Sequence, residues 1–138
     1  MYKDDITILD AGMGKTLGMK GVEIPPTIWS ANALIVAPEM VLEVHRENIA
    51  AGAQMITTNS YGIIPSELEK EGLEEKFEEL NHSAGQLALR AVKDAPLPDK
   101  PVIGLLKVMF PDPVLVFNVS TFIVLIQLSK LFQRLLLP

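Results

Sequence analysis

The stretch DAGMGKTLG at residues 10–18 follows the apolar run ITIL and contains the residue types of a phosphate-binding loop. A P-loop needs a first glycine five positions before its Gly-Lys-Thr triplet, so that backbone N–H groups can surround a β-phosphate. Here that position is Leu9, and the carboxylate of Asp10 follows it and would repel a phosphate. The glycines also miss the dinucleotide-binding spacing, because they are arranged as G-x-G-x-x-x-G. What remains is a carboxylate at the end of an apolar run, in front of a glycine-rich turn.

The surrounding segments alternate between strand and helix patterns. Residues 6–10 and 53–58 have the β-branched composition of short buried strands, and a third strand is predicted from Val102. Helices are predicted over residues 15–20, 38–52, 66–72 and 73–95, with a turn and a short helix at 27–38. This order predicts an α/β fold of parallel β/α units with right-handed crossovers.

Polar residues directly follow two of these strands. Asp10, with Gly12 and Gly14 beyond it, ends the first strand, and TTNSY at residues 57–61 ends the second. The loops at the carboxyl ends of parallel strands converge on one face of the sheet. We therefore expect both groups of residues to meet in one site.

Composition restricts the class of protein. The 138 residues suit one globular domain, and a net charge of −5 without a basic stripe offers nothing that attracts nucleic acid. The sequence has no cysteine, so it provides no disulfide, thiol nucleophile or thiolate metal ligand. Its acidic N-terminal stretch lacks a signal-peptide pattern, from which we expect a cytoplasmic location.

The pieces ILDAGMG, IWSANAL and HRENIAAGAQMITTNSYG, in this order, resemble the homocysteine S-methyltransferase family. Its members are zinc-dependent (β/α)8 barrels that move a methyl group onto the sulfur of homocysteine. The last piece, residues 45–62, is the most specific, and the resemblance covers residues 5–104. It implies that the chain supplies about the first three β/α units of a partial TIM barrel.

The resemblance assigns three residues of the first turn to the substrate pocket. Asp10 would hold the amino group of homocysteine through a charge-assisted hydrogen bond. Gly12 and Gly14 would let the backbone approach the amino acid closely. Without the resemblance, Asp10 equally suits a cap of the following turn.

Three further residues match the same pocket. Trp29 would pack on the substrate or shield the methyl donor with its ring face, and Asn59 and Tyr61 would line the pocket from the second strand's loop. The alternatives are ordinary structural roles, since Trp29 also suits packing beneath a loop and Asn59 suits a turn. His45, on the predicted helix before that strand, is expected to be a satisfied, partly buried histidine rather than a ligand.

The resemblance also implies a cofactor and two substrates. Zinc in this family is held by cysteine thiolates from later strands, and it keeps the sulfur of homocysteine as a thiolate. Because the sequence has no cysteine, we expect no zinc site in this chain and no methyl transfer by it alone. The methyl donor stays open among S-methylmethionine, S-adenosylmethionine, betaine and a methylated folate or corrinoid.

The composition changes after Gly104. Residues 105–138 contain no glycine, one acid and 21 apolar residues out of 34, and the family's pattern is not found there. We interpret residues 1–104 as the N-terminal part of a homocysteine-binding barrel domain and residues 105–138 as an apolar tail from a shifted reading frame or a truncated gene. Two alternatives remain: a membrane anchor in the uncharged run 113–129, and a noncatalytic interaction module whose barrel is completed by another chain.

Overall fold

A pair of short parallel strands lies at the centre of the structure, a computed structural model that describes residues 7–96 and 102–104. Strand β1 (Met55–Thr57) pairs with β2 (Val102–Gly104), with Met55 opposite Val102 and Thr57 opposite Gly104. The intervening chain contains a long helix, so the two strands and their connection form a parallel β/α unit. The predicted parallel arrangement of the second and third strands is thus confirmed.

The predicted first strand is present only in part. Leu9 forms a parallel bridge with Met55, and the Met55 carbonyl accepts a hydrogen bond of 3.0 Å from the Asp10 N–H. The expectation that this strand is buried is wrong for Ile8 and Leu9, whose exposed fractions are 56% and 58%. The physical reason is that this segment lies at a sheet edge, where β1 is the one described strand beside it.

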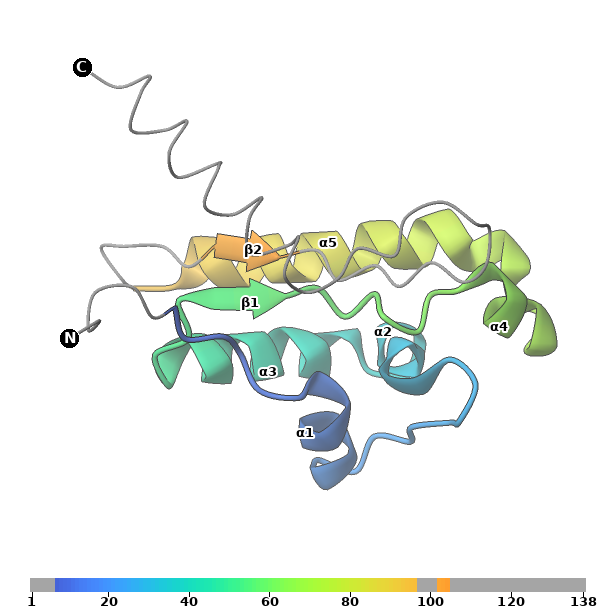
Figure 1. The fold of residues 1–138 in the computed structure, drawn as a ribbon, viewed down its shortest axis with the longest axis horizontal. Coiled ribbons are helices and arrows are strands. Elements are labelled where there is room, and N and C mark those ends of the chain that lie inside the picture. Colours follow the sequence, from blue (N-terminus) through green and yellow to red (C-terminus); the bar gives the residue numbers. More distant parts are fainter. Residues whose placement is uncertain (1–6, 97–101, 105–138) are drawn as a thin grey trace, which may run out of the picture.

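Helices α3 (Pro38–Ala50) and α5 (Phe77–Asp94) run alongside the strands and pack against each other (Figure 1). Both have apolar residues at three- and four-residue spacing, which places one face of each helix in the core. The buried apolar residues of these two helices are Val41, Leu42, Val44, Ile49, Leu80, Ala84, Leu87, Ala88 and Ala91. The helices predicted over residues 38–52 and 73–95 are thus present as α3 and α5, and each buries one apolar face.

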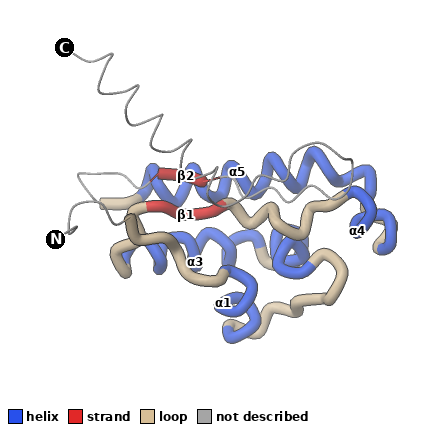
Figure 2. Tube along the Cα trace, in the orientation of Figure 1, coloured by secondary structure: helices blue, strands red, loops and turns tan. Residues whose placement is uncertain are grey.

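Shorter helices lie beside α3 and at one end of the α3–α5 pair (Figure 2). They are α1 (Met13–Met19), the 3-10 helix Trp29–Asn32, α2 (Ala33–Val36), α4 (Pro65–Lys70) and the 3-10 helix Glu74–Lys76. Each falls within or beside a segment predicted as helix or turn. Lys20, directly after α1, donates hydrogen bonds to Glu43 at 2.9 Å and Glu47 at 2.7 Å, which ties α1 to α3.

The ends of α3 follow directly from its sequence. Pro38 occupies the first turn, where its missing N–H leaves no bond unmade, and Glu39 lies at the positive end of the helix dipole. At the other end Gly52 has a φ of +101°, and the Ala53 N–H donates to the Asn48 carbonyl at 3.0 Å. This is the hydrogen-bond pattern of a Schellman motif, which turns the chain from α3 into β1.

Within the described ranges, no helix has both the length and the apolar character needed to cross a bilayer. The run at 113–129, interpreted above as a possible anchor, lies outside the described residues, as does the rest of the segment 105–138.

Two glycines provide a matched test of the helix signals. Gly52→Ala is expected to lower the free energy of unfolding by about 1 kcal/mol or more, because a left-handed φ is unfavourable for a residue with a Cβ. Gly85→Ala, within α5 and with no atom within 4 Å of an added Cβ, is expected to raise it by up to about 1 kcal/mol. Urea unfolding followed by circular dichroism measures both, and equal effects of the two substitutions would contradict this account.

Candidate functional site

The carboxylate of Asp10 is held by Thr57 at the carboxyl end of β1. The Thr57 backbone N–H donates to Asp10 Oδ2 at 2.8 Å, and the Thr57 hydroxyl lies 3.1 Å from both carboxylate oxygens. A carboxylate has about four acceptor sites, so these two donors leave capacity for further hydrogen bonds. Asp10 is half-buried, and the hydrogen bonds from Thr57 fix the orientation of its carboxylate.

The turn after Asp10 brings α1 close to a second loop. The side of Gly12 is open, with no atom within 4 Å of an added Cβ, and its carbonyl accepts the Thr16 N–H at 3.1 Å. A Cβ on Gly14 would lie 3.4 Å from the Cβ of Ser30. Gly12 thus leaves space beside the turn, and Gly14 lies against Ser30 at a distance where an added Cβ would make an ordinary van der Waals contact.

Ser30 and Asn59 form a buried, reciprocal pair of hydrogen bonds. The Ser30 hydroxyl donates to Asn59 Oδ1 at 2.6 Å, and Asn59 Nδ2 donates to the Ser30 carbonyl at 2.8 Å. The two residues are 9% and 3% exposed. Asn59 therefore points into the protein toward Ser30, and both of its polar atoms have partners there.

Trp29 and Tyr61 lie side by side next to this pair. Their ring centroids are 5.2 Å apart with the planes inclined at 40°, a favourable tilted arrangement. The indole N–H of Trp29 donates to the Pro26 carbonyl at 2.6 Å, yet 49% of the residue remains exposed. The two rings form an accessible aromatic surface.

These contacts bring the two predicted strand ends together, while their use as one site stays a prediction. Asp10 contacts Thr57, Gly14 lies against Ser30, Ser30 binds Asn59, and Trp29 contacts Tyr61. Thr57 belonged to the group at residues 57–61 that was expected at the site, but no pocket role was assigned to it, and Ser30 was not among the predicted site residues. Ser30 could have been found from its position next to Trp29 in the piece IWSANAL. The role of Thr57 could not, because it depends on the register of the strands.

His45 is fully buried on α3, and neither ring nitrogen has a hydrogen-bond partner among the described residues. The expectation of a satisfied, partly buried histidine is wrong on both counts. Burial lowers the pKa of His45 below its ordinary value, while the negative charge of Asp10 acts in the opposite direction. The imidazole is therefore neutral at pH 7, and it lies close enough to Asp10 for the carboxylate charge to affect its pKa.

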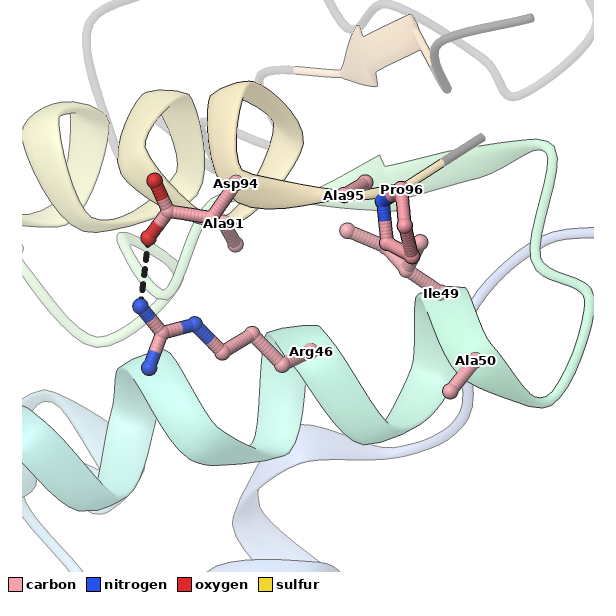
Figure 3. Close-up of a pocket in the computed structure, with 7 residues that line it drawn as sticks. All are labelled: Arg46, Ile49, Ala50, Ala91, Asp94, Ala95 and Pro96. Carbon is pink, nitrogen blue, oxygen red and sulfur yellow. Dashed lines mark hydrogen bonds and ion pairs between the residues drawn. The ribbon is translucent and has the colours of Figure 1, made fainter. Parts of the chain in front are cut away.

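A hollow of about 250 Å³ lies elsewhere, where α3 and α5 end (Figure 3). Its rim carries an ion pair between Arg46 of α3 and Asp94 of α5, and its walls are otherwise apolar. Because both helices lead toward strand starts, this hollow lies at the opposite end of the β/α units from Asp10 and Thr57. It holds none of the predicted site residues.

The described residues contain no group of three histidine, cysteine or carboxylate side chains placed to hold a metal ion. The sequence also has no cysteine, so the residues of this chain do not fit a thiolate-bound zinc.

Lowering the pH from 7.5 to 5.5 is expected to destabilise the chain through His45. The unfolded chain binds a proton at a pKa of about 6.5, whereas the folded chain resists it because the folded pKa is lowered. The His45 contribution to the free energy of unfolding is thus fully present above the unfolded pKa of about 6.5. Below it, the free energy of unfolding declines by up to about 1.4 kcal/mol per pH unit until the folded pKa is reached.

Urea unfolding at both pH values measures this effect. His45→Leu is expected to reduce the pH dependence, and His82→Gln, which removes an exposed imidazole from α5, is the matched control. An unchanged pH dependence in His45→Leu would show that another group is responsible.

This chain is similar in sequence to known proteins. The sequence profile of the family Homocysteine S-methyltransferase matches residues 7–111. The chain is 36% identical over 107 residues to the homocysteine S-methyltransferase of Escherichia coli, covering 77% of this chain and 34% of that protein. It is 31% identical over 85 residues to a selenocysteine Se-methyltransferase of Brassica oleracea var. italica, covering 61% of this chain and 25% of that protein.

A solved structure shares the fold of the matched part. The homocysteine methyltransferase MmuM from Escherichia coli, in its metallated form, superposes with a TM-score of 0.66 at 30% identity. The superposition covers 75% of this chain and 38% of that one, so the chain spans little more than a third of the relative's length. With the profile matching three quarters of its residues, the chain belongs to the homocysteine S-methyltransferase family.

Proposed function

We propose that this chain is the substrate-orienting first part of a homocysteine S-methyltransferase barrel. Its parallel β1–β2 pair and the bridge of Leu9 to Met55 fit about three of eight β/α units. The similarity to MmuM supports this interpretation, because it covers three quarters of this chain at a TM-score of 0.66. The remaining units would have to come from outside the described residues.

The proposal depends chiefly on the Asp10 carboxylate. Thr57 orients it with a backbone N–H and a hydroxyl, at the face of the sheet where loops converge. The unused acceptor sites suit the ammonium group of an amino acid, which would bind by charge-assisted hydrogen bonds. The open side of Gly12 leaves room for the amino acid beside this carboxylate.

The aromatic surface of Trp29 and Tyr61 supplies the second part of the proposed pocket. A half-exposed indole beside a tilted phenol ring can cover the aliphatic part of a substrate or the methyl group of a cationic donor. Both recognition elements come from residues 10–61. The identity of the methyl donor does not follow from them.

Zinc enters this proposal as a group that the chain cannot bind through thiolates. When bound in a member of this family, it would keep the homocysteine sulfur deprotonated at neutral pH. We infer that cysteine ligands would have to come from a further polypeptide segment, because none of these 138 residues is a cysteine. The chain alone is therefore expected to bind homocysteine without transferring a methyl group to it.

Asp10→Asn tests the proposed contact with the amino group. The amide keeps the shape and can still accept the Thr57 N–H, but it loses the charge that would pair with an ammonium. Homocysteine binding, measured by calorimetry on the full chain, is expected to weaken by about tenfold or more, the scale of one charged hydrogen bond. Asp94→Asn, at the distant Arg46 ion pair, is the matched control and should bind like the wild type.

The ligand provides an independent control. 4-Mercaptobutanoic acid, which is homocysteine without its amino group, should bind the wild type about as weakly as homocysteine binds Asp10→Asn. Undiminished binding by the variant, or a wild-type chain that binds neither compound, would overturn the proposed function. Selenocysteine in the same titration tests whether the pocket prefers the shorter selenol substrate named for one relative.

A further inference from the structure

Trp29 has an unusual backbone conformation. Its φ is +50°, which makes it the sole non-glycine residue with positive φ among the residues that the structure describes. For a bulky side chain this left-handed region is unfavourable, and such a conformation persists only where surrounding contacts hold it. Since Trp29 is half-exposed, burial of its own ring is an insufficient explanation.

Beside Trp29, its neighbour Ser30 forms two buried hydrogen bonds with Asn59. One side chain, the Asn59 carboxamide, receives the Ser30 hydroxyl at 2.6 Å and donates to the Ser30 carbonyl at 2.8 Å. Ser30, the residue that follows Trp29, is thus fixed at its side chain and at its own carbonyl oxygen. Because both groups are buried, water competes little for these bonds.

The other side of Trp29 is held by close backbone packing. A Cβ on Gly62 would lie 2.0 Å from the carbonyl oxygen of Ile28, so the loop after Tyr61 fits against this segment only through a glycine. The indole N–H of Trp29 is bound to the Pro26 carbonyl. The segments 26–30 and 59–62 therefore pack closely against each other beside the half-exposed Trp29 ring.

We propose that Asn59 and Ser30 are positioning residues that hold Trp29 in its left-handed conformation against Tyr61. Asn59 then acts on a ligand only through the aromatic surface, instead of contacting it as a pocket residue. Its 3% exposure and the inward orientation of its carboxamide support this role. The importance of this arrangement for binding rests on the proposed function, because the substrate or methyl donor would pack on the surface of Trp29 and Tyr61.

A spectroscopic test on the full chain does not require any ligand. Trp29 is the single tryptophan, so indole fluorescence reports on it alone. In Asn59→Ala and Ser30→Ala the emission is expected to move to longer wavelength, and the near-ultraviolet circular dichroism of the Trp29–Tyr61 pair to be lost. The far-ultraviolet spectrum, which reports the helices, should stay as in the wild type.

Thr58→Val is the matched control. It deletes another buried hydroxyl in the same loop, which lies 2.8 Å from the Ser60 hydroxyl and not in the pair at Ser30. Its indole spectra should match those of the wild type. Folded Ser30 and Asn59 variants with unchanged indole spectra, or a Thr58→Val variant with the same spectral loss, would overturn the proposal.

If Asn59→Ala unfolds, the spectra of Ser30→Ala test the proposal in its place. Ser30→Ala removes one hydroxyl and leaves the hydrogen bond from the Asn59 amide to the Ser30 carbonyl. The wild type provides a further measurement, since hydrogen exchange of the Asn59 carboxamide should be slowed well below that of exposed asparagine amides. Fast exchange there would overturn the proposal.

Homocysteine titration separates this inference from the function on which it rests. Asn59→Ala is expected to weaken binding by about tenfold, the scale of a modest rearrangement in a binding surface. If the wild type binds no homocysteine, the proposed function fails and the spectra still decide on the positioning role. If the wild type binds homocysteine and the indole spectra of the Ser30 and Asn59 variants do not change, the positioning role alone is wrong.

Discussion

Parallel pairing along β1 is the constraint on which the site depends. Met55 bridges Leu9 on one side and lies opposite Val102 on the other, so the neighbouring chain segments run in the same direction. Their carboxyl ends consequently open on one face, where Thr57 reaches the Asp10 carboxylate. Shifting this register by one residue would turn the Thr57 hydroxyl to the other face of the sheet and remove that contact.

The helices contribute to the site by fixing where β1 begins. The Schellman turn at Gly52 converts the end of α3 into the start of the strand within three residues. Helix α3 also packs against α5, so the two long helices and β1 belong to one packed unit. The loops beyond the strand can then use polar contacts for orientation, since apolar burial already holds the scaffold.

Local signals predicted most of the scaffold. Pro38 and Gly52 bound α3 in the sequence because their effects act on the backbone within one turn, and the spacing of Leu80, Leu87 and Ala91 marks the buried face of α5. The first strand was misjudged because burial depends on what lies beside a segment. No periodicity in ITIL reveals that Leu9 is at an edge.

The site residues were predictable only as far as chemistry follows from residue type. A carboxylate beside glycines marked Asp10 as a candidate, and the family resemblance gave it a proposed role, but the partner of each polar group depends on register and loop packing. Asn59 illustrates the difference, since an amide at a strand end suits a ligand and an internal bond equally well until Ser30 is located.

His45 shows the converse. It is a titratable group whose type suggests chemistry, yet burial without a hydrogen-bond partner among the described residues keeps it neutral, and its negative neighbour Asp10 does not reverse this. Because His45 is neutral, its imidazole does not offset the charge of the Asp10 carboxylate. Under the proposed function, that charge stays available for the ammonium group of an amino acid.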